Sequence, residues 1–246
     1  MKGKNALTSQ SSYLDVVYVV KEDENNEELR YSLRSLVNLP YRKVFIAGYK
    51  PSWVKNVEYL PVKQLGGRFD NQSRIIKTAC SNNDVFDDFI LMNDDFFIIN
   101  NISHVPNLRR LKPIEHYIKQ YTELYMKPGF SSFYLETMKD IAVLLRRIGF
   151  RDIDSYELHV PMVINKDKYL ALCSMYPETE SSHRRTMYGN YYHIGGKRIN
   201  DVKVVKDGKK FSKDVPFLST IDDVFDGSEV GRFIMTRFTE KCTYER

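Results

Sequence analysis

The sequence predicts an α/β fold in which a mainly parallel sheet is flanked by helices. Strand-like and helical patterns alternate between residues 14 and 92, in the order strand, helix, strand, strand, helix, strand. That alternation is typical of a parallel sheet with helices packed on it. The composition agrees, because 42% hydrophobic and 28% charged residues in a chain of 246 are typical of a soluble globular protein.

The first strand and the first helix have the clearest signals. Residues 14–20 read L-D-V-V-Y-V-V, a β-branched run that predicts a buried strand. A helix is expected next, with Asn25 or Asn26 as its N-cap, two glutamates in its first turn and Pro40 just past its end. Its leucines recur with helical spacing, so one face of this helix is expected to lie in the core.

Two short strands, a second helix and a fourth strand follow. The strands are expected over residues 43–47 and 57–60. The helix is expected to begin near Asn71 and to run through I-I-K-T-A. The fourth strand covers residues 89–92 and leads directly into the polar sequence N-D-D. These elements complete the predicted parallel sheet.

The rest of the chain is mainly helical and then mixed. Helical periodicity covers residues 114–148, and a K-P-G sequence at 127–129 predicts a break between two helices. A final helix is expected over residues 228–237. Residues 1–12 are polar and are expected to be disordered. Residues 13–246 are therefore expected to form a single domain.

Composition and charge exclude several classes of protein. No apolar run is long enough for a transmembrane helix, and the polar N-terminus does not resemble a secretory signal. Three scattered cysteines argue for a reducing compartment and against a disulfide framework or a zinc site, so a cytoplasmic location is expected. A net charge of +5 suits an anionic substrate but is small for a dedicated nucleic-acid binder.

The polar sequence Asn93, Asp94 and Asp95 interrupts the apolar run F-I-L-M-N-D-D-F-F-I-I. Buried carboxylates are costly unless they turn away from the core or meet a positive group. In parallel sheets ligands bind beyond the carboxyl ends of the strands, where two acids can hold Mg²⁺ or Mn²⁺. Strand alternation would place Asn93 and Asp95 on one side and Asp94 on the other. The alternative is an ordinary Asx turn after a strand.

Two further groups of residues suit anion binding and proton transfer. The sequence G-G-R-F-D-N-Q-S-R-I-I-K suggests a glycine loop and a helix start that offers backbone N–H groups to an anion; a plain capped helix is the alternative. His159 is a candidate general base, with His183 and His193 as rivals. Arg184 and Arg185 suit bidentate phosphate binding, although solvated arginines are the alternative.

Several of these sequences resemble the Stealth family, which includes bacterial capsule polymerases and the enzyme that tags lysosomal glycans with N-acetylglucosamine phosphate. The resemblance rests on D-V-V-Y, on L-R-Y-S-L-R-S-L with F-I-L-M-N-D-D-F-F-I, on H-V-P-M-V-I-N-K with R-R-T-M-Y, and on F-L-S-T-I-D-D-V-F-D with R-F-T-E-K-C-T-Y-E. The chain departs from the family at V-V-K-E-D, where T-W-V-D-G is usual. It also departs at Lys77, where a glutamate is usual.

The resemblance implies a glycosyltransferase-A-like transferase with a Rossmann-like nucleotide-binding half. Such an enzyme moves hexose 1-phosphate from a nucleotide-sugar to an acceptor hydroxyl. Residues 13–110 would form the nucleotide-sugar-binding half, 111–150 a helical insertion and 151–246 the acceptor and catalytic half. Two alternatives stay open: a metal-dependent glycosyltransferase that moves the sugar itself to a glycan, a protein or a modified DNA base, and a non-catalytic nucleotide- or nucleic-acid-binding module.

The resemblance also implies a role for each candidate site residue, with Mg²⁺ or Mn²⁺ as the cofactor. The implied metal ligands are Asp94 and Asp95. The implied donor-binding residues are Lys21, Asn71, Gln72, Ser73, Arg74 and Asn93. The implied catalytic residues are His159 as general base, Arg185 and Arg184 as the phosphate clamp, and Asp95.

Overall fold

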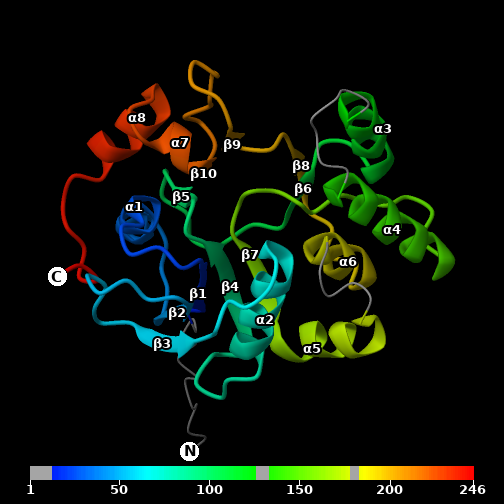
Figure 1. Ribbon diagram of the computed structural model, residues 1–246, viewed down its shortest axis with the longest axis horizontal. Coiled ribbons are helices and arrows are strands. Elements are labelled where there is room, and N and C mark those ends of the chain that lie inside the picture. The colour runs from blue at the N-terminus through cyan, green and yellow to red at the C-terminus, as the bar shows by residue number, and fades with distance from the viewer. Residues whose placement is uncertain (1–12, 126–132, 178–182) are drawn as a thin grey trace, which may run out of the picture.

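A computed structural model describes residues 13–125, 133–177 and 183–246. The disorder expected for residues 1–12 and the helix break expected at residues 127–129 lie outside the described residues. The central sheet has the strand order β3-β2-β1-β4-β7, and only β7 runs antiparallel to its neighbour (Figure 1). Its strands are β3 (Glu58–Pro61), β2 (Val44–Gly48), β1 (Asp15–Val20), β4 (Asp88–Asn93) and β7 (Met162–Asn165). The predicted α/β fold with a mainly parallel sheet is confirmed.

Helices cover both faces of this sheet. They are α1 (Glu27–Ser35), α2 (Arg68–Cys80), α3 (Ile114–Tyr125), α4 (Phe133–Arg147), α5 (Lys166–Met175), α6 (Arg184–Tyr191), α7 (Asp222–Phe225) and α8 (Glu229–Arg237), with a 3₁₀ turn η1 (Leu36–Asn38) after α1. Helices α3 to α6 lie together at one end of the molecule (Figure 1). No helix within the described residues is both long and apolar enough to cross a bilayer.

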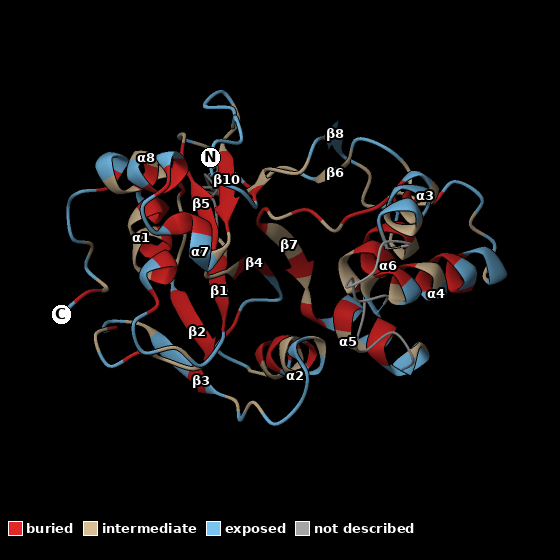
Figure 2. Cartoon of the chain, turned by 45° about the horizontal axis from the view of Figure 1, so that its top comes forward, coloured by how far each residue is buried: buried red, intermediate tan, exposed pale blue. Residues whose placement is uncertain are grey.

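Alternate residues of each central strand belong to opposite faces, as strand geometry requires. Val17, Phe45 and Phe89 pack in a core with α2 to α6, whereas Tyr18 and Ile46 pack in a second core with α1. The strands β1 and β2 are buried almost throughout, while the helices bury one side only (Figure 2). Each large side chain buried in this way contributes roughly 1.5–3 kcal/mol to the free energy of unfolding.

A three-stranded sheet with the order β5-β10-β9 lies beside the end of β4. Its strands are β5 (Phe96–Ile98), β10 (Phe217–Thr220) and β9 (Lys203–Val204), and α7 and α8 cover it through a third apolar cluster. A separate two-stranded pair joins β6 (Leu108–Arg110) and β8 (Lys197–Ile199). Since β4 and β5 are separated only by Asp94 and Asp95, these two acids link the central sheet to the small sheet.

The strand order reverses direction between β1 and β4. The chain passes from β1 to β2 and β3 on one side, and then returns through α2 to place β4 on the other side of β1. The connections diverge at such a point and leave a crevice beyond the carboxyl ends of the two strands. In open α/β sheets this crevice is where ligands bind. A ligand site is therefore expected at the segments that follow β1 and β4.

Candidate functional site

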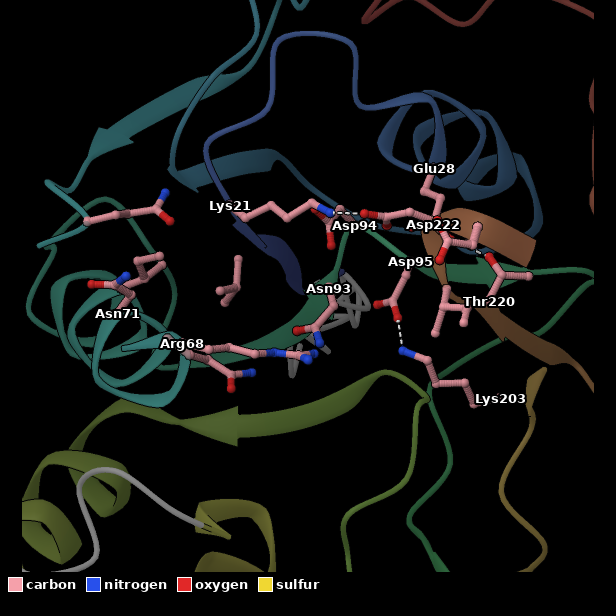
Figure 3. A pocket seen from close by; sticks show the side chains of 16 residues that line it. Lys21, Glu28, Arg68, Asn71, Asn93, Asp94, Asp95, Lys203, Thr220 and Asp222 are labelled. Carbon is pink, nitrogen blue, oxygen red and sulfur yellow. Dashed lines mark hydrogen bonds and ion pairs between the residues drawn. The ribbon is translucent and has the colours of Figure 1, made fainter. Parts of the chain in front are cut away.

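A cavity of about 510 Å³ lies beyond the carboxyl ends of β1 and β4. Its wall combines residues from the end of β1, the start of α1, the first turns of α2, the turn after β4, the start of β9, and the end of β10 with the start of α7. Charged side chains of both signs point into it (Figure 3). The acids are Glu28, Asp94, Asp95, Asp222 and Asp223, and the bases are Lys21, Arg68 and Lys203.

The polar sequence after β4 lies in this wall. Asn93 ends the strand, and Asp94 and Asp95 form the turn before β5. All three line the cavity, so the expectation that Asp94 would face the opposite side is wrong. Strand alternation no longer applies at Asp94, because the chain has already left the extended conformation there. The structure thus brings the two acids together on one side.

Asp94 is held by the helix that follows β1. Its Oδ2 accepts a 2.7 Å hydrogen bond from Nδ2 of Asn26, and Oδ1 of Asn26 caps α1 by accepting from the backbone N–H of Leu29 at 2.9 Å. Burial, with a further contribution from the neighbouring Asp95, raises the pKa of Asp94 to about 6. The N-cap predicted from the sequence therefore also orients a carboxylate of the cavity.

Asp95 has a different set of partners. Its Oδ2 accepts from Nζ of Lys203 at 2.7 Å (Figure 3). The same oxygen accepts from Oγ of Ser219 at 3.1 Å. The side chains of Asp95 and Lys203 are only 11% and 12% exposed, so this ion pair is largely removed from water. A positive group thus sits against the acid.

Glu28 is a member of the site that the sequence did not single out. It is 6% exposed, and one carboxylate oxygen accepts a hydrogen bond from the hydroxyl of Thr220. Burial, together with a hydrogen bond to Asp222, raises the pKa of Glu28 to about 9, so this side chain is protonated at neutral pH. The same hydrogen bond, together with an ion pair to Lys21, lowers the pKa of Asp222. The protonated form of Glu28 and the ionised form of Asp222 are therefore both favoured.

Helix α2 begins earlier than the sequence suggests. It starts at Arg68 after an N-cap at Gly67, so the expected start near Asn71 is wrong. Asn71 does not cap the helix, because its side-chain amide bonds both backbone groups of Gly66 (3.0 and 2.8 Å). Arg68 is the first residue of α2, and its side chain extends across the cavity toward Asn93 (Figure 3).

The other residues predicted to bind the donor divide between two sides of α2. Asn71 and Gln72 line the cavity, as does Lys21 from the end of β1. Ser73 is buried and does not line this cavity. Arg74 points away from it, because its guanidinium donates to the backbone carbonyl of Lys63 at 3.0 Å.

His159 does not line the cavity. Its Nδ1 lies 2.8 Å from Oδ2 of Asp201, and its backbone N–H donates to Oδ1 of the same carboxylate at 3.1 Å. Desolvation opposes ionisation of Asp201, but the bonds from His159 outweigh it and lower the pKa of Asp201 to about 2. The imidazole also packs edge-on against Phe96, the residue after Asp95. Asp201 therefore orients His159, which lies outside the cavity but close to the acidic turn formed by Asp94 and Asp95.

The two arginines make protein contacts. Both terminal nitrogens of Arg185 donate to the carbonyls of Leu158 and Val160, the residues that flank His159. Arg184 donates to the hydroxyl of Tyr169 at 3.2 Å and contacts the sulfur of Cys173. Neither arginine lines the cavity of about 510 Å³; they line another of about 70 Å³, which adjoins it at Gln72 and Asn93. Their role as a phosphate clamp stays a prediction.

The oxygen atoms of Asp94 and Asp95 suit a hard divalent cation. Within the described ranges, no set of three or more His, Cys, Asp and Glu side chains is arranged to hold an ion by itself. Mg²⁺ is typically held by one or two carboxylates, with water and substrate phosphates completing the shell. Burial and the neighbouring Asp95 raise the pKa of Asp94, so a cation beside this carboxylate would stabilise its ionised form. The residues therefore fit Mg²⁺ or Mn²⁺ together with a phosphate ligand.

Comparison with family models found no match. Comparison with curated proteins found none either. The resemblance to the Stealth family thus stays a hypothesis that rests on the short sequences quoted above, and the function has to be argued from the geometry of the site.

Proposed function

We propose that this chain is a transferase that uses a nucleotide-sugar donor. The observation that carries the proposal is the position of Asp94 and Asp95 in a cavity beyond the carboxyl ends of β1 and β4, where the strand order reverses. An acidic turn beside basic side chains suits a ligand that brings both a divalent cation and phosphate groups. A pyrophosphate-linked donor is such a ligand, and the volume of about 510 Å³ suits a small organic molecule.

Within this proposal, each group of the cavity has a distinct task. Asp94 and Asp95 would hold Mg²⁺ or Mn²⁺, which supplies positive charge beside the donor phosphates. Arg68 and the backbone N–H groups at the start of α2, where Gly67 offers no side-chain cap, would bind the same phosphates from the other side. Glycosyltransferase-A-like architecture is part of the proposal, and its support is the mainly parallel sheet with these acids at its edge.

The favoured reaction is transfer of hexose 1-phosphate to an acceptor hydroxyl, as the Stealth resemblance implies. His159 is the proposed base that takes the proton from this hydroxyl, because Asp201 holds its Nδ1 and leaves Nε2 as the reactive nitrogen. Arg185 supports this role, since it bonds the carbonyls on either side of His159. This assignment requires a rearrangement that brings the imidazole of His159 to the cavity.

The test is incubation with a panel of nucleotide-sugars and divalent metals, followed by identification of the nucleotide released. Transfer of sugar phosphate releases a nucleoside monophosphate, whereas transfer of the sugar alone releases the diphosphate. Release of neither, combined with measurable nucleotide binding, would instead favour the binding-module alternative. Steeply salt-dependent DNA binding would favour a nucleic-acid acceptor.

The Asp95→Ala variant and a chelator test the metal within the same assay. Asp95→Ala should abolish turnover, and excess chelator should do the same to the unaltered protein. Asp87→Ala is the matched control, because Asp87 is an exposed acid just before β4 and lies outside the cavity. Full turnover by Asp95→Ala, or in excess chelator, would contradict the metal role.

A further inference from the structure

Lys203 occupies a position in the small sheet that keeps its ammonium against Asp95. In the small sheet Ser219 of β10 pairs with Phe96 of β5 on one side and with Lys203 of β9 on the other. Asp95 lies in the turn directly before Phe96, so this pairing brings it close to Ser219 and Lys203, which both donate to the same oxygen of Asp95. The contact is therefore set by backbone pairing, although Asp95 and Lys203 lie 108 residues apart in sequence.

We propose that Lys203 is a built-in counter-cation that makes binding of a divalent metal depend on the phosphates of the donor. Without the donor, the ammonium neutralises Asp95 and competes with the metal for it. With the donor present, a phosphate offers Lys203 a new partner, so the ammonium leaves Asp95 and the metal takes its place. This inference rests on the proposed function, because it assigns a role to Lys203 in the same cavity.

The burial of this ion pair gives the competition its strength. With side chains 11% and 12% exposed, Asp95 and Lys203 interact in a medium that screens less than water. Removal of one partner from a buried pair leaves the other charge uncompensated, which is strongly unfavourable. An Asp95 without Lys203 would therefore attract any available cation more strongly.

Lys203 is also placed to contact an anion. Its side chain lines the cavity together with Lys21 and Arg68, and Figure 3 shows its Nζ directed at the acidic turn from the side of β9. Lys21 is engaged with Asp222 on another side of the cavity. A phosphate between the acidic turn and β9 would thus meet the ammonium of Lys203.

Two binding measurements on Lys203→Gln test the proposal, and they are expected to change in opposite directions. Mn²⁺ alone, followed by electron paramagnetic resonance of the free ion, should bind Lys203→Gln roughly tenfold more tightly than the unaltered protein, since the competitor for Asp95 is gone. Inorganic pyrophosphate without metal, measured by calorimetry, should bind roughly tenfold more weakly, since a cation is lost. A variant that merely folds poorly would weaken both.

Two matched variants control for charge and for folding. Lys206→Gln removes the same charge from an exposed position on the same segment, outside the cavity, and should change neither affinity. Lys203→Arg keeps the charge and should resemble the unaltered protein in its Mn²⁺ affinity. Unchanged or weakened Mn²⁺ binding by Lys203→Gln would overturn the competition, and unchanged pyrophosphate binding would overturn the phosphate contact.

These outcomes can be told apart from those of the nucleotide-release assay. Opposite changes in Mn²⁺ and pyrophosphate affinity without any nucleotide release would support the role of Lys203 and refute the transferase. Nucleotide release with unchanged affinities would refute the role of Lys203 alone.

Discussion

Replacement of Glu28 by glutamine tests whether the cavity holds a protonated carboxyl group at neutral pH. Glu28 is 6% exposed, and burial raises its pKa to about 9. Glutamine has the shape of a protonated glutamate, and its amide can donate to Asp222 as the carboxyl O–H does. The variant should therefore fold, and only the dependence of its stability on pH should differ.

The expected magnitude follows from proton linkage. Above the ordinary glutamate pKa of 4.5, the unfolded chain loses a proton that the folded chain keeps until about pH 9. In this window the free energy of unfolding falls by about 1.4 kcal/mol for each pH unit because of Glu28. Between about pH 5.5 and 7.5, Glu28→Gln should therefore gain roughly 2.7 kcal/mol relative to the unaltered protein.

Urea denaturation at several pH values within this window, followed by circular dichroism, measures the effect. A chelator has to be present, because a bound cation would favour the ionised acids of the cavity. Glu27→Gln is the control, since Glu27 is an exposed neighbour paired with Arg30, and its effect should not change with pH. A constant difference between Glu28→Gln and the unaltered protein across the window would show that Glu28 is ionised in the folded state.

Three further predictions concern the walls of the cavity and the packing around it. Arg68→Ala should weaken nucleotide binding roughly tenfold, whereas Arg74→Ala, on the other side of α2, should leave it nearly unchanged by calorimetry. Gly231→Ala should lower the free energy of unfolding by roughly 1–3 kcal/mol or more, because a Cβ would lie 1.8 Å from the carbonyl oxygen of Phe225. Glu245→Gln should cost roughly 3 kcal/mol in a urea titration near pH 7, because its buried carboxylate holds two arginines. Its two arginines outweigh the effect of burial and lower the pKa of Glu245 to about 2, so its stabilisation is complete above about pH 4.5 and is lost as pH falls through about 2. The deficit of Glu245→Gln should thus shrink on acidification, and a deficit independent of pH would count against the pairing.

Local sequence patterns were sufficient to predict the elements that lie in the centre of the sheet. The β-branched run at residues 14–20 forms β1 (Asp15–Val20), and the predicted N-cap Asn26 accepts a hydrogen bond from the backbone of Leu29. A buried strand and a helix cap depend on residues within a few positions of each other, so their signals are visible in one stretch of sequence. The candidate acids at the end of β4 were found for the same reason.

The start of α2 and the arrangement of the acidic turn needed the tertiary structure. Asn71 is a residue type that favours N-caps, but its side chain bonds Gly66 instead and the helix begins at Arg68. Asp94 and Asp95 turn to the same side because β5 leaves β4 for another sheet. Helix propensity and the alternation of side chains along a strand apply to a chain that continues in one conformation. Neither predicts the structure where tertiary packing changes the direction of the chain.

The sequence by itself determined the fold class, the four parallel strands β1 to β4 and the presence of acids beyond β4. Only the tertiary structure distinguished Glu28 from its exposed neighbour Glu27, and only it placed Lys203 against Asp95. The physical reason is that burial and ion pairing act between side chains brought together from distant parts of the chain. Asp95 and Lys203 are 108 residues apart, and no local pattern records which charges will meet across such a separation.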